Sequence, residues 1–424
     1  MTSLADAKRL LQEGRFAEAG RACEALLEQT PDDVEALNIV ALAAVRDGKA
    51  AAGVALLERA TRIDPADPIS FLHLGRAQEG LGNLQAALGS IGRAVRLKPG
   101  FFLARLHYAI LLERVGEPEQ ASMQFARALR DAQAQGQWVN SASTPAGLRA
   151  LVEHAVRTFR TRRRAMLFSI TERLADRYGR SSMSRVEKCL RVYLGEEAAT
   201  FPDPRQQPGF LYFPDLPPSA YLDRSLLAGI ARLESRTTDI REELLQLMRS
   251  DEGRERVFTT DDVERENLRV ASGSPTWNGY YLYRHGARHD ENCDRCPVTA
   301  AEIEQLALAR VREHAPEVLF SVFSAGTHLL PHRGVTNTRV VGHLPLIVPD
   351  ECALCVGGEV HRWQAGRVVV FDDTYEHEAW NRSKETRVVL IFDLWNPHLT
   401  EPERAAITDV VEAIGDLREA IEGA

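Results

Sequence analysis

Two histidines in the C-terminal half of the chain, His332 and His377, have the residue type and setting of metal ligands. They stand 45 residues apart, each beside a run of β-forming residues. Neutral imidazoles are good ligands for Fe(II), and iron sites that activate dioxygen commonly use two histidines and one carboxylate on one face of the metal. The carboxylate would usually stand two positions after the first histidine, but this chain has Gly334 there. The pair therefore indicates a candidate iron site that lacks its usual third ligand.

Neighbouring residues favour a ligand role for these histidines over a structural one. A histidine taken singly is more often held by ordinary hydrogen bonds than bound to a metal. His377, however, follows a predicted strand that ends in Asp372 and Asp373, and a strand end at the mouth of a barrel can aim a ligand inward. Arg387 opens the next predicted strand, where its guanidinium could bind one carboxylate of a dicarboxylic cosubstrate whose other end chelates the iron.

Short predicted strands supply the frame that would hold these residues. The β-rich runs, separated by Gly, Pro, Asn and Asp, cover residues 277–283, 319–323, 339–348, 367–371 and 387–394. Many short strands with turns between them favour a closed sandwich or jelly roll. We also expect one or two helices over residues 223–250 and another over residues 299–314, which would brace one sheet from outside.

The first third of the chain repeats with a period of 34 residues. Small residues recur in one register, which is typical of helices that pack closely in pairs. Glycines and prolines recur at the same spacing, at Gly14, Gly48, Gly82 and Gly116 and at Pro31, Pro65 and Pro99. We therefore predict four tetratricopeptide repeats over residues 1–135, forming an all-α solenoid. Such arrays bind peptides or proteins, so we expect a protein partner, although a structural stalk or a dimer contact is the alternative.

Between the repeats and the strands, residues 136–200 are expected to form a helical connector, because apolar residues recur there at helical spacing. A proline-rich stretch from Phe201 to Pro208 follows and marks a domain boundary. The predicted architecture is therefore multidomain α plus β, with the repeat solenoid, the connector and a C-terminal β-rich domain over residues 201–424.

The composition is that of an ordinary soluble protein with two or three domains. The 424 residues carry a formal net charge of −8, and the pI is about 5.9, which argues against a general nucleic-acid-binding protein. No apolar run approaches the roughly 18 residues of a membrane span, and the first residues lack the pattern of a secretory signal. We therefore expect a cytoplasmic protein without a membrane span.

Residues 321–400 resemble the aspartyl/asparaginyl β-hydroxylase family of Fe(II)- and 2-oxoglutarate-dependent oxygenases. Weaker similarity extends back through Trp277 to about residue 207, so that the resemblance covers about half of the chain. It rests on short motifs, which are Gly326-Thr-His-Leu-Leu-Pro-His332-Arg-Gly-Val-Thr-Asn-Thr-Arg339, His343-Leu-Pro-Leu346, Trp363-x-x-Gly366, Phe371-Asp-Asp-Thr-Tyr-Glu-His377-Glu-Ala-Trp380, Arg387 and Asp393-x-Trp395-x-Pro397.

The resemblance implies a double-stranded β-helix, a cupin-like jelly roll, with an iron site of a particular kind. In this family the carboxylate ligand is missing and water fills its place, so Gly334 fits the pattern. His332 and His377 would be the only protein ligands to iron. Asp373 would hold the water or orient His377 from outside the ligand shell.

The resemblance also implies a cosubstrate site and an activity. Ser321 and Arg387 would bind the distal carboxylate of 2-oxoglutarate, and His343 would lie near its chelating end. Arg339 and Trp277 would line the substrate side. The implied enzyme is a dioxygenase that uses Fe(II), 2-oxoglutarate and O2 to hydroxylate an unactivated carbon. Its expected target is the β-carbon of an Asp/Asn-type residue in a protein or carrier-bound substrate recruited by the repeats.

One departure from the family keeps other substrates and functions open. Val341 stands two residues after Arg339, where the animal peptide hydroxylases have a second arginine, so the pocket loses a cation. Free amino acids and lipid acyl chains are therefore alternative substrates. A non-catalytic repeat scaffold with a metal- or 2-oxoglutarate-sensing barrel is an alternative function. A two-histidine site for non-oxidative chemistry is another, but it would give Arg387 no task.

Four of the six cysteines form two Cys-x-x-Cys pairs, Cys293/Cys296 and Cys352/Cys355. A four-thiolate zinc site is one interpretation of such pairs. The second pair, however, lies in a strand-like stretch, where the two side chains would diverge. Six cysteines in 424 residues also do not make a disulfide framework. We therefore favour buried or redox-sensitive thiols over zinc ligands.

Overall fold

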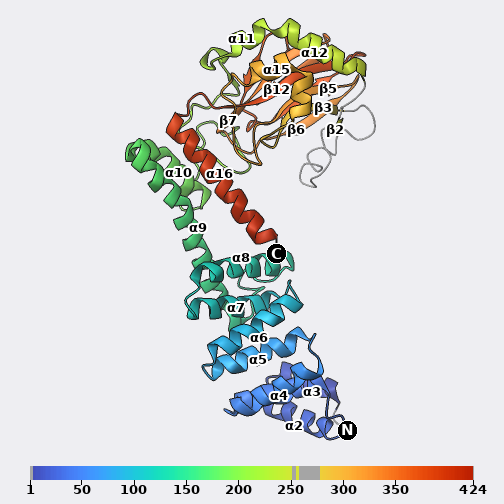
Figure 1. Ribbon diagram of the computed structural model, residues 1–424, viewed down its shortest axis with the longest axis vertical. Helices are drawn as coiled ribbons and strands as arrows, with labels where there is room; N and C mark the ends of the chain where they lie inside the picture. Colours follow the sequence, from blue (N-terminus) through green and yellow to red (C-terminus); the bar gives the residue numbers. More distant parts are fainter. Residues whose placement is uncertain (1–2, 251–254, 257–276, 424) are drawn as a thin grey trace. The chain divides into compact units, whose positions relative to one another are not determined.

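The structure is a computed structural model that describes residues 3–250, 255–256 and 277–423 (Figure 1). The chain forms two compact units, and each is described by itself. The first comprises residues up to 165 together with residues from 417 onward, and the second comprises residues 166–416.

The first unit contains the repeat array. In its described part, eight helices follow one another as four pairs, and Figure 1 shows successive pairs stacked in the order of the sequence. The helices are α1 (Leu4–Gln12), α2 (Phe16–Leu27), α3 (Val34–Arg46), α4 (Ala50–Ile63), α5 (Pro68–Gly80), α6 (Leu84–Leu97), α7 (Phe102–Arg114) and α8 (Pro118–Ala134). The predicted tetratricopeptide array is therefore confirmed.

The recurring glycines have two physical roles in this array. Gly14, Gly48, Gly82 and Gly116 each lie between the two helices of a pair, with φ between 77° and 86°, a left-handed conformation that glycine adopts without strain. Gly75, inside α5, instead allows a close approach of α6. A Cβ atom at Gly75 would lie 2.3 Å from Cγ1 of Ile91 and 2.9 Å from the carbonyl oxygen of Ala87.

Helices continue beyond the repeats, as expected for the connector. α9 (Arg149–Tyr178) begins in the first unit and ends in the second, and α10 (Ser184–Tyr193) lies in the second. The remaining helices are α11 (Ile230–Ser235), α12 (Thr237–Ser250), α14 (Asp290–Arg295), α15 (Pro297–Ile303) and α16 (Glu401–Glu422). Among the described helices, none combines the length and the apolar character that crossing a membrane requires.

The second unit is built on two antiparallel sheets. In the part of the chain that the structure describes, the larger sheet has eight strands in the order β1-β10-β7-β12-β5-β3-β2, with β4 paired to β3, and the smaller has the order β6-β11-β8-β9. The strands are β1 (Tyr221–Leu222), β2 (Glu255–Arg256), β3 (Trp277–Arg284), β4 (Ala287–Arg288), β5 (Val318–Phe323), β6 (His328–His332), β7 (Arg339–Ile347), β8 (Cys352–Val356), β9 (Glu359–His361), β10 (Val369–Phe371), β11 (His377–Asn381) and β12 (Arg387–Trp395). The predicted antiparallel β architecture is confirmed.

Apolar side chains cover both faces of the larger sheet. One cluster joins residues of both sheets, among them Val341, Phe371 and Leu354. On the opposite face, Ile240 and Leu244 of α12 pack with strand residues, and α11, α12 and α15 lie along this face in Figure 1. The expected bracing helices are therefore present.

Two expectations about local structure were wrong or incomplete. The helix expected over residues 299–314 ends at Ile303, because residues 307–309 form backbone hydrogen bonds with the end of β12, from Trp395 to Ala307 and from Ala309 to Asp393. The strands β6, β9 and β11 were not predicted. They are short and rich in histidine, and β6 contains Pro331, so their β propensity is low.

Replacing Gly75 by alanine should destabilise the repeat array, because the new methyl group would overlap Ile91 and the Ala87 carbonyl. We expect a loss of about 1–3 kcal/mol, seen as a lower midpoint when the helical circular dichroism signal is followed during heating. Gly89→Ala in α6 is the matched control, since a Cβ there meets nothing within 4 Å. That variant should keep its stability or gain up to about 1 kcal/mol. Equal losses in both variants would contradict the packing argument.

Candidate active site

His332 and His377 lie directly opposite one another, at the end of β6 and the start of β11. The centroids of their rings are 4.1 Å apart. Nδ1 of His332 is 2.8 Å from the carbonyl oxygen of Leu330, and Nδ1 of His377 is 3.1 Å from that of Tyr375. A neutral imidazole that donates from Nδ1 to a carbonyl presents an unprotonated Nε2. The two Nε2 atoms are therefore available to one metal ion.

The surroundings keep both imidazoles neutral. Burial lowers the pKa of His377 to about 3, and the nearby His332 contributes to the shift. Burial also lowers the pKa of His332. Because metal binding requires the unprotonated ring, the apo site is already in the binding form at neutral pH.

Asp373 occupies the space that a side chain at position 334 would need. The Gly334 amide donates to the backbone carbonyl of Asp373 at 2.6 Å. A Cβ atom on Gly334 would lie only 2.1 Å from Cγ of Asp373 and within 2.3 Å of both its carboxylate oxygens. The site therefore does contain a carboxylate next to the first histidine, but it comes from the segment before β11. Burial raises the pKa of this carboxyl to about 7, although Arg339 opposes the shift.

Arg339, on β7, joins Asp373 to a second buried carboxylate. Its Nη2 is 3.2 Å from Asp373 Oδ2, and its Nη1 is 2.6 Å from Asp393 Oδ1. Although burial opposes it, the two carboxylates raise the pKa of Arg339. Oδ1 of Asp373 has no hydrogen-bond partner among the described residues. Arg339 therefore fixes one oxygen of Asp373 and leaves the other free to hold a ligand or a water molecule.

Arg387 lies fully buried at the other end of the same cavity. Its Nη1 donates to the carbonyl oxygen of Ser321 at 3.2 Å and to Ser321 Oγ at 3.3 Å, and Trp277 Nε1 donates to the same hydroxyl at 3.0 Å. The guanidinium stacks on the rings of Phe323, at 3.7 Å, and Trp363, at 4.8 Å. Burial lowers the pKa of Arg387 to about 9. No carboxylate among the described residues pairs with it, and its Nε has no partner there.

A single cavity of about 490 Å³ between the two sheets contains all the residues predicted for the site. Besides the histidine pair it is lined by Asp373, Arg339, Ser321, Arg387, His343 and Trp277. His343 is packed between the rings of Phe371, at 5.0 Å, and Trp363, at 5.9 Å. Its Nδ1 is buried with no partner among the described residues, and burial keeps its pKa well below the usual value. The structure thus brings the whole predicted set together.

Three residues with roles in this cavity were given no role from the sequence, although Trp363 and Asp393 stand in the family motifs. Asp393 neutralises Arg339, while Trp363 and Phe323 form the aromatic walls around Arg387. Asp393 shares the inward-facing side of β12 with Arg387, since the two are six residues apart and strand residues alternate between faces. That alternation and the motif Asp393-x-Trp395-x-Pro397 were the available signals for Asp393. The loop residue Trp363 gave no periodic signal, and its available signal was the motif Trp363-x-x-Gly366.

The cysteine pairs do not converge on a metal site. Cys293 is buried within α14, Cys296 is buried between α14 and α15, and Cys352 packs between the two sheets. All six cysteines are free thiols. Within residues 3–250, 255–256 and 277–423, no group of three or more His, Cys, Asp or Glu side chains has metal-binding geometry. Three of the four paired thiols are buried, as expected, and Cys355 is half-buried.

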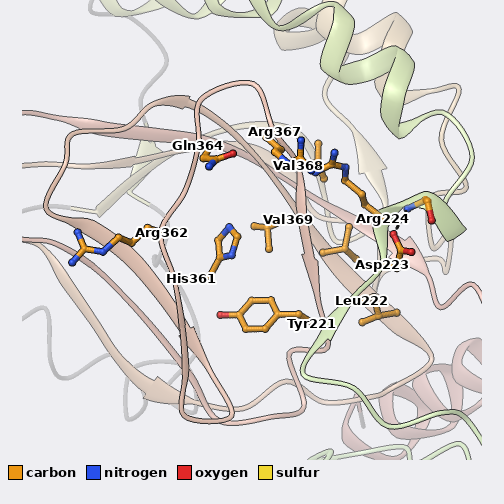
Figure 2. Close-up of a pocket in the computed structure, with 12 residues that line it drawn as sticks. Tyr221, Leu222, Asp223, Arg224, His361, Arg362, Gln364, Arg367, Val368 and Val369 are labelled. Carbon is orange, nitrogen blue, oxygen red and sulfur yellow. Dashed lines mark hydrogen bonds between the residues drawn. The ribbon is translucent and has the colours of Figure 1, made fainter.

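A second cavity, of about 580 Å³, is lined by residues of β1, by the connection from β9 to β10 and by β10 itself (Figure 2). It contains none of the residues predicted for the site. Arg224, Arg362 and Arg367 border it together with Asp223, and Arg224 is paired with Glu234 at 3.4 Å. Trp363, in the same connection, packs instead on Arg387 of the histidine-containing cavity.

Comparison with known families assigns both parts of the chain. Residues 234–397 match the family model described as Aspartyl/Asparaginyl beta-hydroxylase, and residues 4–68 match a tetratricopeptide repeat model. The C-terminal region thus matches a hydroxylase family over residues 234–397. The expected resemblance to the aspartyl/asparaginyl β-hydroxylases is confirmed.

Individual relatives carry hydroxylase names. The chain is 32% identical over 179 residues to the aspartyl/asparaginyl beta-hydroxylase of Mus musculus, covering 42% of this chain and 23% of that protein. It is 35% identical over 186 residues to the ornithine lipid ester-linked acyl 2-hydroxylase of Rhizobium tropici, covering 43% of this chain and 62% of that protein. The chain therefore spans less than two thirds of either relative. A solved structure of YrrB, titled a TPR protein with an unusual peptide-binding site, is 22% identical, covers 31% of this chain and 67% of that chain, and has a TM-score of 0.28.

Gly334→Ala should weaken metal binding at the histidine pair, because the new Cβ would displace the Asp373 carboxylate. We expect the dissociation constant for Co(II), measured by calorimetry, to rise by about 10- to 100-fold, as for other losses of a group that supports metal ligands. Gly209→Ala is the control, because a Cβ there meets only the Gly334 carbonyl oxygen at 3.9 Å. Unchanged affinity in Gly334→Ala would contradict the steric argument.

Proposed function

We propose that the protein is an Fe(II)- and 2-oxoglutarate-dependent dioxygenase that hydroxylates an unactivated carbon. The observation that carries the proposal is the buried Arg387, which has no carboxylate partner among the described residues and lies in the same cavity as the two histidines. A buried cation without a counter-ion is costly, and the site regains that cost when an anion binds. A planar guanidinium binds a carboxylate by two parallel hydrogen bonds.

The residues present fit both the metal and the cosubstrate. His332 and His377 would hold iron through their Nε2 atoms, and the unpartnered oxygen of Asp373 would hold a metal-bound water from the side of Gly334. Arg387 and Ser321 would bind the distal carboxylate of 2-oxoglutarate. His343, whose Nδ1 is buried without a partner among the described residues, would contact the cosubstrate between these two ends.

In this proposal, the residues of the chain position the reacting groups and exclude water from the site. When bound, iron and 2-oxoglutarate would supply the chemistry by which O2 gives one oxygen atom to the conversion of 2-oxoglutarate to succinate and carbon dioxide and the other to a substrate C–H bond. Arg339 holds the Asp373 carboxylate in place, and Asp393 prevents Arg339 from competing for the cosubstrate. Phe371 and Trp363 exclude water around His343, so the ion pair formed at Arg387 is strengthened by the low dielectric.

Two classes of substrate are candidates for this active site. The mouse relative is named for aspartyl and asparaginyl residues, and the Rhizobium relative is named for an ester-linked acyl chain. The repeat array supports recruitment of a protein partner, which would present or carry the substrate. The charge and polarity of the cavity walls beyond the histidine pair would decide between an aspartyl or asparaginyl side chain and an acyl chain.

Arg387→Lys should raise the KM for 2-oxoglutarate by about tenfold, because an ammonium cannot reproduce the guanidinium fork. The measurement is the conversion of labelled 2-oxoglutarate to succinate by purified protein with Fe(II) and ascorbate. Arg367→Lys is the matched control, since Arg367 borders the other cavity (Figure 2) and should leave the KM unchanged.

His377→Ala in the same assay should abolish turnover, because one of the two proposed iron ligands is removed. The proposal fails if the unaltered protein neither converts 2-oxoglutarate nor binds it in calorimetry. It also fails if His377→Ala converts 2-oxoglutarate as fast as the unaltered protein.

A further inference from the structure

An apolar row crosses the wall of the catalytic cavity beside the proposed iron site. Residues opposite one another on paired strands share a face of a sheet. Tyr281 on β3 pairs with Leu319 on β5, and Leu319 pairs with Ile391 on β12. Ile391 in turn pairs with His343 on β7. All four line the cavity, so a continuous apolar surface leads across three strands to the proposed cosubstrate-binding His343.

Three of the basic residues that line the cavity already have carboxylate partners. Arg339 is held by Asp373 and Asp393, as described above. Arg333 Nη1 is 3.1 Å from Glu376, and His285 Nδ1 is 3.1 Å from Glu317. A substrate carboxylate bound by any of these three would have to break an existing pair. Arg284 also lines the cavity, and its Cζ lies 4.9 Å from the centroid of the Tyr281 ring.

Val341 makes the wall beside the histidines apolar as well. The strand register places it opposite Asp393 on one side and Phe371 on the other. Its side chain is 8% exposed and lines the cavity. A substrate carboxylate at this position would meet a methyl surface and the negative charge of Asp393, which disfavours it.

The geometry points to a hydrocarbon chain, such as the acyl chain of a lipid or of a carrier thioester, as the substrate group in this cavity. This inference rests on the proposed function and names its substrate class. The row of Tyr281, Leu319 and Ile391 spans three strands, which is about 10 Å at the usual strand spacing. An extended acyl chain covers such a surface, whereas an aspartate side chain has a single methylene and needs a cation for its carboxylate.

Binding to the metal-free protein tests the substrate class independently of turnover. The probes are acylglycines of six to twelve carbons and a blocked peptide with a central aspartate, titrated into the full chain by calorimetry. Affinity for the acylglycines should rise by roughly fourfold per added methylene until the row is covered. The aspartyl peptide should bind more weakly than the longest acylglycine. Tighter binding of the peptide, or affinity independent of chain length, would overturn the inference.

Substitutions at Ile391 locate the effect on the row. Ile391→Asn should weaken dodecanoylglycine binding by about tenfold, because a polar group then faces the chain, whereas Ile391→Leu should retain it. Both variants should bind 2-oxoglutarate like the unaltered protein, which also checks their folding. If both variants bound dodecanoylglycine equally well, the acyl chain would not lie on the row at Ile391, and the inference would be overturned.

Turnover assays distinguish a lipid from a carrier as the source of the acyl chain. They also distinguish a failure of the proposed substrate class from a failure of the proposed dioxygenase activity. Dodecanoyl phosphatidylcholine vesicles represent a lipid source, and dodecanoyl pantetheine represents a carrier source. With Fe(II) and 2-oxoglutarate, one of them should stimulate succinate formation and gain one oxygen atom by mass spectrometry. Oxygen insertion into the aspartyl peptide alone would contradict the acyl-chain substrate but agree with the proposed dioxygenase activity. Absence of 2-oxoglutarate binding would contradict the proposed dioxygenase activity itself.

Discussion

Charged side chains that are buried between the two sheets need partners of opposite charge. The arrangement of these partners determines the charge of the candidate active site. Arg339 is placed between Asp373 and Asp393, so three charged groups from β7, from β12 and from the segment before β11 neutralise one another in part. The arrangement leaves one buried cation, Arg387, without a carboxylate partner among the described residues. The cavity is therefore lined by a buried positive charge that no described carboxylate offsets. An anionic cosubstrate would complete the pairing that the chain itself leaves unfinished.

The histidine pair depends on the same construction. Two backbone carbonyls orient the rings, and burial keeps the rings uncharged. Because both histidines stand at ends of strands in the smaller sheet, their separation is set by the pairing of β6 with β11. The adjacent Arg339 network then orients Asp373 against Gly334. The paired strands and the carboxylate held by Arg339 together define the side of the cavity where we propose that iron binds.

The repeats could be predicted from a recurring period, and the longer strands from their β-forming residues. The 34-residue spacing indicated the helix pairs, and the β-rich runs between turn residues indicated β7 and β12. The smaller sheet was missed because β6 and β11 are short and carry polar ends, so they acquire β structure from their partners rather than from propensity. The early end of α15 has the same origin, since pairing with β12 outweighs the helical tendency of residues 304–314. The pairing of Arg339 with Asp393 could not be predicted from the sequence either. These residues lie on β7 and β12, and only the sheet order shows that the two strands are neighbours.

The side chain of Asp373 fills the space that a side chain at position 334 would need. A substitution at one of these positions therefore affects which residues the other can hold. A carboxylate at position 334 cannot be added while Asp373 keeps its present place, because the first atom of the new side chain would coincide with the existing carboxyl group. Conversely, removing Asp373 alone leaves Arg339 with a single counter-ion in a buried setting. A change from this two-histidine arrangement to one with a ligand at position 334 therefore has to pass through both positions together. Steric exclusion therefore limits which side chains positions 334 and 373 can hold at the same time.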